Sequence, residues 1–288
     1  MNLSRTPFVV SNGSTTWYDP NSLEDLLNLK EEFPQGRIVV GNSEVGIEQK
    51  FKNMKYAVLI GGTNIAELKG ISAGESEYIF GANTPLSDIA HFCEGGADGT
   101  VTFAFSNMLR WFASTQIRNT ASLAGNLATA SPISDMNPML AAADASMTIK
   151  SKERGERSIK VSETFLAYRK TALQPDEVIV NVRVPKTSKF EYIFPYKQAK
   201  RREDDISIVT SGMRVKLAPS SDDFHFIVVD SSFSFGGMSF KTVMAPNTSA
   251  FLLNKPWTSE TFEEARKVLA LDLPLPDDVP GGQPEYRR

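Results

Sequence analysis

The feature that most constrains the fold of this sequence is a change in its apolar pattern near residue 145. Before that point, short apolar runs such as residues 38–40 and 56–60 end in glycine turns and alternate with helical stretches. After it come longer strand candidates separated by turn residues, at 190–197, 206–217 and 224–235. This order predicts an α+β fold with two or three subdomains, and the segment 185–189 is the best internal boundary.

Capping residues and apolar stripes mark the helices. Asn21 or Ser22 begins the first helix, and a second is predicted over residues 86–92. A longer helix is predicted over residues 103–117. By contrast, the small and hydroxyl-rich stretch 122–132 is typical of irregular backbone rather than of a helix or a strand.

The charge balance and the scarcity of cysteine and histidine exclude several classes of function. The chain carries 31 Lys and Arg against 34 Asp and Glu, a net charge of −3, which disfavours a nucleic-acid or anionic-membrane binder. The single cysteine, Cys93, excludes an internal disulfide and an iron–sulfur cluster held by this chain alone. The two histidines, His91 and His225, are too few for a histidine-rich metal site, so we expect no metal.

The sequence also carries no membrane or export signal. No apolar run approaches the roughly 20 residues that span a membrane, and residues 1–18 lack a basic start followed by an apolar stretch. We therefore expect a cytoplasmic protein without a nucleic-acid or membrane partner. Residues 1–15 are expected to form a lead-in rather than a domain.

The loop that follows the apolar run 38–40 can bind a phosphate. A strand that ends in such a loop leaves free backbone N–H groups, and Gly41 and Gly46 allow a ligand to approach them closely. The pattern is neither the GxGxxG fingerprint nor the lysine-containing P-loop. A tight turn without a ligand is the alternative that these residues leave open.

Two further polar segments are candidates for a site. Residues 122–135 supply many neutral donors and one carboxylate, Asp135, a set that suits a pyrophosphate and a ribose held by hydrogen bonds. Residues 196–205 place basic side chains directly before acidic ones and so make a field of mixed sign. The alternatives are a plain surface loop for the first segment and a solvated turn for the second.

These segments together resemble one known family. The sequence reads RIVVGNSEVGIE at 37–48, LRWFA at 109–113, TASPISDMNP at 129–138 and KQAKRREDD at 197–205. In this order they resemble the FAD-binding domain of eukaryotic xanthine dehydrogenase/oxidase, a molybdenum hydroxylase. The resemblance extends from about Thr16 to the C-terminus.

The resemblance implies a domain organisation. It implies a PCMH or vanillyl-alcohol-oxidase-type FAD-binding domain over residues 16–185, with two α+β subdomains split near 85–100. It also implies a C-terminal subdomain of an antiparallel sheet plus helices over 190–288, truncated at its end. The iron–sulfur (2Fe-2S) and molybdopterin domains of the full-length family enzymes are absent from this chain and are its expected partners.

The resemblance also implies a set of FAD contacts. Residues 38–45 would wrap the FAD pyrophosphate, with Glu44 near the flavin, and residues 122–126 would form a second phosphate-side loop. No side chain is expected to act as a nucleophile, because the flavin itself transfers the hydride or the electrons. The implied FAD-binding residues are Ile38, Val39, Val40, Gly41, Asn42, Ser43, Glu44, Val45, Phe112, Ala113, Ser122, Gly125, Asn126, Thr129, Ser134, Asp135, Ile179 and Lys197.

The charged turn gains a role from the same resemblance. Arg110, Trp111 and Arg202 match a cluster whose cation–π stacking fixes this turn, and Asp204 matches an acidic residue near the flavin. In the family the turn governs whether NAD⁺ or O₂ takes the electrons. A negative charge at Asp204 would disfavour extra electron density on the flavin and favour the positive nicotinamide. Residues 168–170 resemble a family segment on the NAD side.

The implied activity is that of an oxidoreductase limited to the flavin half-reaction. FAD would accept electrons from iron–sulfur centres and reduce NAD⁺ or O₂, while hypoxanthine and xanthine are oxidised to urate in purine catabolism. Three alternatives stay open: the FAD domain of an aldehyde oxidase that uses O₂, a fragment that is inactive without its missing domains, and a vanillyl-alcohol-oxidase-type flavoenzyme with its own substrate. One departure is Ala124, where the family usually has glycine; at positive φ it would cost about 1 kcal/mol.

Overall fold

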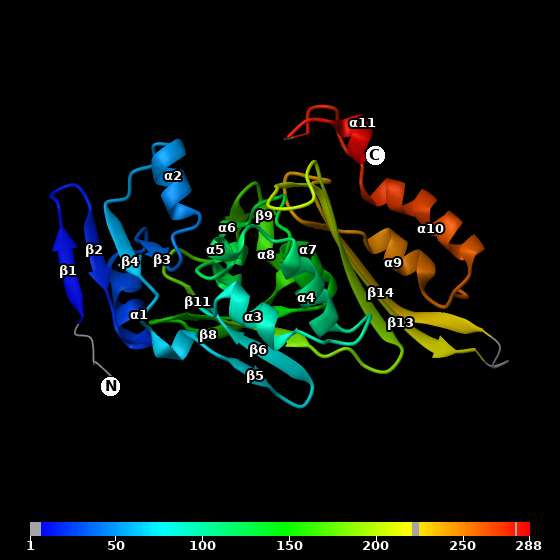
Figure 1. Ribbon diagram of the computed structural model, residues 1–288, viewed down its shortest axis with the longest axis horizontal. Helices are drawn as coiled ribbons and strands as arrows, with labels where there is room; N and C mark the ends of the chain where they lie inside the picture. Colours follow the sequence, from blue (N-terminus) through cyan, green and yellow to red (C-terminus); the bar gives the residue numbers. More distant parts are fainter. Residues whose placement is uncertain (1–6, 221–224, 280) are drawn as a thin grey trace.

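The N-terminal end of the molecule is a four-stranded mixed sheet (Figure 1). A computed structural model describes residues 7–220, 225–279 and 281–288 of the chain. The strand order is β1-β2-β4-β3, with β1 antiparallel to β2 and with β2 and β3 parallel to β4. The strands are β1 (Phe8–Ser11), β2 (Thr16–Asp19), β3 (Arg37–Val39) and β4 (Val58–Gly61). Strand β1 falls within the expected lead-in, of which residues 1–6 lie outside the described residues.

Two helices belong to this end of the molecule. Helix α1 (Leu23–Glu32) begins after Ser22, whose hydroxyl accepts a hydrogen bond from the N–H of Asp25. Ser22 is therefore the cap, and the predicted helix is confirmed. Helix α2 (Val45–Phe51) follows the loop after β3, and a 3-10 turn, η1 (Ala66–Leu68), follows β4.

The centre of the molecule is a five-stranded antiparallel sheet in the order β5-β6-β11-β7-β8. Strand β11 lies in the middle, and its ladder with β7 is irregular between Ile179 and Asn181. The strands are β5 (Ile71–Ala73), β6 (Glu77–Gly81), β7 (Ser146–Ser151), β8 (Gly155–Lys160) and β11 (Val178–Pro185). The last strand of this half of the chain is thus inserted between two earlier ones, which ties the whole half together.

Short helices and one small hairpin connect these strands. The helix predicted over residues 86–92 is confirmed as α3. The helices are α3 (Leu86–Phe92), α4 (Val101–Arg110), α5 (Thr115–Arg118), α6 (Leu123–Thr129), α7 (Asn137–Ala142) and α8 (Val161–Thr164). The hairpin pairs β9 (Phe165–Ala167) with β10 (Lys170–Thr171).

The single helix predicted over residues 103–117 is wrong, because the chain breaks it into α4 and α5. The break is at Ala113, which adopts a left-handed backbone with φ of +43°. The Arg118 guanidinium closes the break by donating to the carbonyl oxygens of Phe112 and Ala113, each at 2.7 Å. Apolar spacing continues through this region, so it gives no sign of the interruption.

The prediction of irregular backbone over residues 122–132 is also wrong, because residues 123–129 form α6. The Ser122 hydroxyl caps this helix by accepting a hydrogen bond from the N–H of Gly125. Leu123 and Leu127 bury one face of it. Ala124 is helical rather than at positive φ, so the strain expected from its replacement of glycine does not arise.

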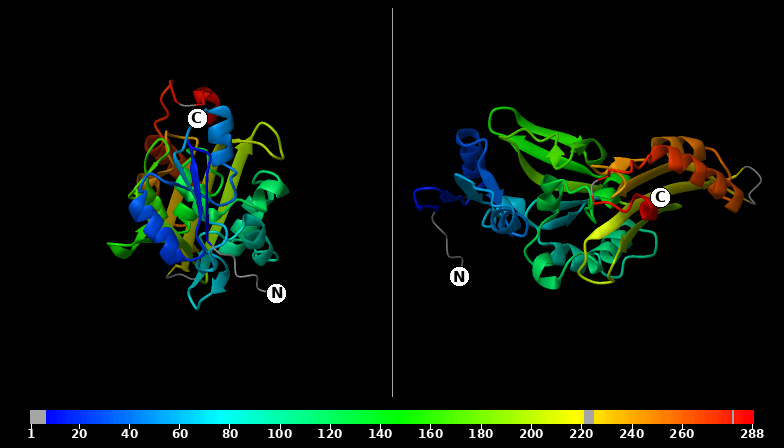
Figure 2. Two further views of the ribbon diagram at one scale, coloured as in Figure 1. Left: turned by 90° about the vertical axis from the view of Figure 1, so that its left-hand side faces the viewer. Right: turned by 90° about the horizontal axis from the view of Figure 1, so that it is seen from above.

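The C-terminal end is a four-stranded antiparallel sheet in the order β12-β13-β14-β15. Helices α4 and α7 contact this sheet from the centre of the molecule, whereas α9 and α10 cover its outer side (Figure 1, Figure 2). The elements are β12 (Glu191–Ala199), β13 (Ser207–Pro219), β14 (Phe226–Gly236), β15 (Val243–Met244), α9 (Pro246–Leu252), α10 (Ser259–Asp272) and α11 (Pro284–Arg287). The predicted long strands are confirmed, although Phe224 lies outside the described residues.

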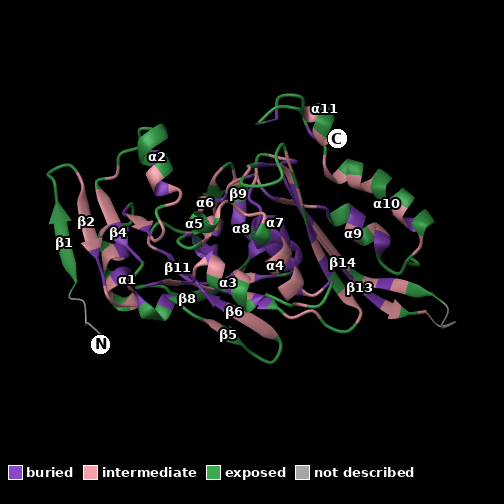
Figure 3. Cartoon of the chain, in the orientation of Figure 1, coloured by how far each residue is buried: buried purple, intermediate pink, exposed green. Residues whose placement is uncertain are grey.

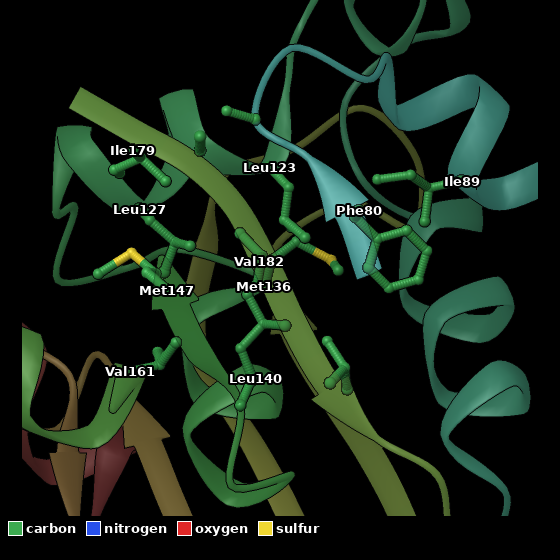
Figure 4. Close-up of a cluster of buried hydrophobic side chains, with 14 of the residues drawn as sticks. Phe80, Ile89, Leu123, Leu127, Met136, Leu140, Met147, Val161, Ile179 and Val182 are labelled. Atoms are coloured by element: carbon green, nitrogen blue, oxygen red, sulfur yellow. The ribbon is translucent and has the colours of Figure 1, made fainter. Parts of the chain in front are cut away.

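The largest hydrophobic core lies between the central sheet and its helices, where buried residues concentrate (Figure 3). Figure 4 shows Val182 of β11 beside Leu123 of α6 and Met136, all fully buried. Smaller clusters lie under α9 and α10. The helices and antiparallel sheets confirm the α+β class, and no helix among the described residues is long and apolar enough to cross a membrane.

Cys93 belongs to the large core and is 1% exposed. Burial raises the pKa of its thiol to about 12. The thiolate is the reactive form, so the folded chain should hardly react with a disulfide reagent at about pH 8. The absorbance of the thiol that the reagent releases should rise at once when the chain is unfolded in urea, and only slowly without urea. Fast labelling of the native chain would contradict the burial of Cys93.

Candidate functional site

A cavity of about 900 Å³ lies between the N-terminal sheet and the centre of the molecule. Its size is within the roughly 300–1,000 Å³ typical of small-molecule and cofactor sites. Residues from three stretches line it: 36–45, which includes β3; 121–135, around α6; and 169–179, which ends in β11. Residues from the turn 201–207 reach it from the C-terminal sheet.

The loop at residues 41–44 lines this cavity and carries unpaired backbone donors. Strand β3 is held to β4 up to Val39, whose carbonyl oxygen accepts from the N–H of Gly62 at 2.9 Å. Beyond it, the N–H groups of residues 41–44 donate to no other group in the described part of the chain. Successive free N–H groups beside a cavity attract an anion such as a phosphate.

Gly41 is required by the close approach of two backbones. A Cβ atom at this position would lie 1.9 Å from the carbonyl oxygen of Thr120 and 2.4 Å from its carbon. A side chain at this position would therefore force one of the two backbones to move. The contact holds the loop directly against the segment that leads into α6 on the opposite wall.

The opposite wall is formed by the start of α6 and the loop after it. Ser122, Gly125 and Asn126 line the cavity. The Ser134 hydroxyl donates to Asn126 Oδ1 at 2.7 Å and itself accepts from backbone N–H groups at the start of α7. These bonds fix the orientation of the Asn126 amide before any ligand binds.

A buried ion pair lies at the end of the cavity that the C-terminal sheet reaches. Lys197 Nζ lies 2.7 Å from Asp135 Oδ2 and also donates to the carbonyl oxygen of Trp111 at 2.8 Å. The Ser207 hydroxyl donates to Asp135 Oδ1 at 2.6 Å. Burial raises the pKa of Asp135 above its ordinary value, although the charge of Lys197 and both hydrogen bonds oppose the rise. The pair joins the centre of the molecule to β12.

The charged turn folds beside this end. The guanidinium carbons of Arg110 and Arg202 lie 4.8 Å and 5.3 Å from the centre of a Trp111 ring. Asp205 accepts from the N–H groups of Arg201 and Ile206 and so holds the turn together. Asp204 lines the cavity. The structure therefore brings the three residues of the expected stacking cluster together.

Several residues of the cavity wall adopt the left-handed backbone that favours glycine. They are Asn42, Ala113, Arg169 and Asp204, with φ between +43° and +54°. Such conformations cost about 1–3 kcal/mol each in non-glycine residues and concentrate at functional sites. Their position on one cavity supports its being the working site of the chain.

The structure places most of the predicted cofactor contacts on this cavity. Lys197 does not line it but reaches Asp135, and the stacked Arg110, Trp111 and Arg202 do not line it either. The predicted residues that line the cavity are Ile38, Val39, Val40, Gly41, Asn42, Ser43, Glu44, Val45, Phe112, Ala113, Ser122, Gly125, Asn126, Thr129, Ser134, Asp135, Ile179 and Asp204. The binding roles of all these residues stay a prediction.

Sequence reasoning missed three charged residues on the wall: Lys30, Glu177 and, as a neighbour of Glu44, Arg169. Lys30 is 5% exposed and donates to the carbonyl oxygens of Pro34 and Gly36 at 2.7 and 2.8 Å. Burial lowers its pKa to about 8. Its helical spacing from Leu26 was a usable signal. Among the described residues, no group of His, Cys, Asp or Glu side chains could hold a metal ion.

Comparison with known families assigns the chain. Residues 12–187 match the model of the FAD-binding domain in molybdopterin dehydrogenase. The chain belongs to this family. Residues 194–288 match the CO dehydrogenase flavoprotein C-terminal domain. The fold is therefore that of an FAD-binding domain followed by a flavoprotein C-terminal subdomain, as the resemblance implied.

Curated relatives of this FAD-binding domain are xanthine dehydrogenases. The chain is 40% identical to xanthine dehydrogenase/oxidase of Mus musculus over 283 residues, and 38% identical to xanthine dehydrogenase 1 of Arabidopsis thaliana over 283 residues. These alignments cover 95% and 96% of the chain but 21% of each relative. The chain thus spans about a fifth of the length of these relatives and corresponds to their FAD-domain region.

Solved structures share the fold at lower identity. The carbon monoxide dehydrogenase of Hydrogenophaga pseudoflava matches with a TM-score of 0.83 and 20% identity, covering 94% of this chain and 91% of that one. Quinoline 2-oxidoreductase of Pseudomonas putida 86 matches with a TM-score of 0.80 and 20% identity, covering 96% and 93%. The predicted fold class is confirmed.

The close approach at Gly41 can be tested by substitution. Gly41→Ala should destabilise the chain by about 1–3 kcal/mol, because the new Cβ atom must push Thr120 away. Gly74→Ala is the matched control, since its Cβ atom would lie 3.4 Å from the nearest atom. Urea unfolding should show a lower midpoint for Gly41→Ala than for the control. Equal midpoints would show that the two backbones have room between them.

Proposed function

We propose that the cavity holds FAD and that the chain carries out the flavin half-reaction of a xanthine dehydrogenase-like enzyme. The observation that carries this proposal is the row of free N–H groups at residues 41–44, which line a cavity of about 900 Å³. A dinucleotide needs this combination of an anion-binding loop and a long cavity. The family of the chain supports the same cofactor.

The residues present fit the two ends of such a cofactor. The free N–H groups of the loop would hold the pyrophosphate by neutral donors. Asn126 and Ser122 would add hydrogen bonds from the opposite wall, where both line the cavity. Asp135 would contact the other end, because it lines the cavity and its buried ion pair with Lys197 holds the carboxylate in place. FAD supplies the redox chemistry when bound, and the protein supplies its position and its electrostatic surroundings.

The relatives' names and their greater length support a proposal for the electron donors and acceptors. Xanthine dehydrogenases oxidise xanthine, and this chain spans about a fifth of them. We infer that iron–sulfur and molybdopterin domains outside this chain oxidise hypoxanthine or xanthine in purine catabolism and deliver the electrons. The flavin would then reduce NAD⁺ or O₂. The alternative is an aldehyde-oxidase-type flavin domain that uses O₂ alone.

A visible absorption spectrum of the purified chain, before and after anaerobic NADH, tests the proposal. We expect a bound flavin whose visible absorbance NADH bleaches, because the FAD site and the nicotinamide site would both lie on this chain. Flavin that stays oxidised would favour the O₂-using alternative. If the chain binds no flavin even after reconstitution with FAD, the proposal fails for the isolated chain.

Asp204 offers a sharper test of the acceptor. Asp204→Asn removes the charge but keeps a residue that tolerates the left-handed backbone. Reoxidation of the reduced flavin by NAD⁺ should slow about tenfold relative to reoxidation by O₂, the effect of ~1.4 kcal/mol from one nearby charge. Stopped-flow absorbance measures both rates. Glu203→Gln is the control, since Glu203 is charged and adjacent but does not line the cavity. Equal loss with both acceptors would argue against a role for the charge.

A further inference from the structure

Helix α2 is held in place by very little apolar contact. Val45 is its only buried apolar residue, and the other buried side chain is the carboxylate Glu48. Ile47 and Phe51 are 44% and 66% exposed, and most of the helix is exposed in Figure 3. Hydrophobic packing therefore contributes little to the position of α2 and of the loop that precedes it.

Polar contacts supply what apolar packing does not. Two contacts come from the N-terminal sheet region. The Tyr56 hydroxyl donates to Glu48 Oε2 at 2.6 Å, and Arg37 Nη2 lies 3.3 Å from the same oxygen. Both partners come from the N-terminal sheet region that α2 already belongs to. They anchor the helix locally but do not connect it to the other side of the cavity.

Arg169 makes that connection. It lies in the turn between β9 and β10, 125 residues after Glu44. Its Nη1 donates to Glu44 Oε1 at 2.5 Å and lies 3.7 Å from Glu48 Oε1. Lys52, which directly follows α2, also pairs with this carboxylate, with its Nζ 3.2 Å from Glu44 Oε1. Glu44 and Arg169 both line the cavity, so this pair joins two stretches of its wall that are far apart in the chain.

The backbone and the charges at this pair support a specific role. Arg169 has φ of +53°, a left-handed backbone typical of the tight turn that joins β9 to β10, so the hairpin fixes where its side chain starts. The two side chains are 29% and 28% exposed. Burial alone would raise the pKa of Glu44, but Arg169 and Lys52 outweigh it and hold that pKa below its ordinary value. Glu44 is therefore ionised at neutral pH, and the positive charges of Arg169 and Lys52 balance its negative charge.

We propose that Arg169 is a positioning residue that fastens α2 and the loop at residues 41–44 across the cavity, and that it thereby retains the bound cofactor. The inference rests on the proposed function, because it concerns how the same site retains FAD. Arg169 does two things there. It fixes the helix that follows the anion-binding loop, and it neutralises a carboxylate that would otherwise repel the pyrophosphate.

The affinity for FAD tests the proposal. Arg169→Gln should raise the Kd for FAD, measured by flavin fluorescence quenching, by about tenfold, the size of one lost charge-assisted contact. Arg169→Lys should restore part of the affinity. In a double-mutant cycle, adding Glu44→Gln to Arg169→Gln should recover part of the lost affinity, because it removes the carboxylate that Arg169 no longer neutralises. Arg183→Gln is the matched control, because Arg183 pairs with Glu77 in the central sheet and does not line the cavity.

A second measurement needs no cofactor. Hydrogen exchange of the amides in residues 45–51 should speed up in Arg169→Gln but not in Arg183→Gln, in the FAD-free chain. If exchange is faster in Arg169→Gln but the unsubstituted chain does not bind FAD, the proposed function is refuted and Arg169 remains the residue that fastens α2. Unchanged exchange and an unchanged Kd in Arg169→Gln would overturn the inference itself. Circular dichroism of each variant separates these outcomes from a failure to fold.

Discussion

The contact between Gly41 and the backbone of Thr120 sets the geometry on which the site depends. It brings the loop after β3 within van der Waals distance of the segment that leads into α6. The same segment is fixed from behind, since Leu86 N–H donates to the Ala121 carbonyl oxygen at 2.9 Å. Two elements far apart in the chain therefore face each other at a set separation. The free N–H groups of the loop and the polar start of α6 become the two walls of one cavity.

The ion pair of Asp135 and Lys197 fixes the cavity in the other direction. Lys197 belongs to β12, Asp135 precedes α7, and the Trp111 carbonyl that shares the ammonium ends α4. Both charged side chains are about nine-tenths buried. Removing either partner would leave a buried charge without compensation, which costs more than the pair itself contributes. The pair therefore selects one placement of the C-terminal sheet, and with it the placement of the charged turn.

The regular helices and strands could be predicted from the sequence, but the places where the chain interrupts or begins a helix unexpectedly could not. Helix α3 and the long C-terminal strands follow from apolar spacing and turn residues alone. The break at Ala113 and the helix after Ser122 depend on a left-handed alanine and on a serine cap, neither of which leaves a periodic signal. At the site, family resemblance pointed to the residues that line the cavity. It could not show that Arg169 meets Glu44, because pairing across 125 residues is decided by the assembled fold.

The left-handed residues of the cavity wall show how the chain sustains a strained site. Each is held by a polar contact of its own. The Asn42 carbonyl oxygen accepts from Gly46 N–H at 3.3 Å, that of Ala113 accepts from Arg118 at 2.7 Å, and that of Asp204 accepts from Arg201 at 3.1 Å. Arg169 is held through its own side chain by Glu44. Asparagine and aspartate tolerate this backbone, so the strain falls mainly on Ala113 and Arg169. Glycine would relieve it there, but it would also widen the range of conformations open to the loop. A wall of strained and individually fastened residues keeps its donors in place before the ligand arrives, so binding need not order them.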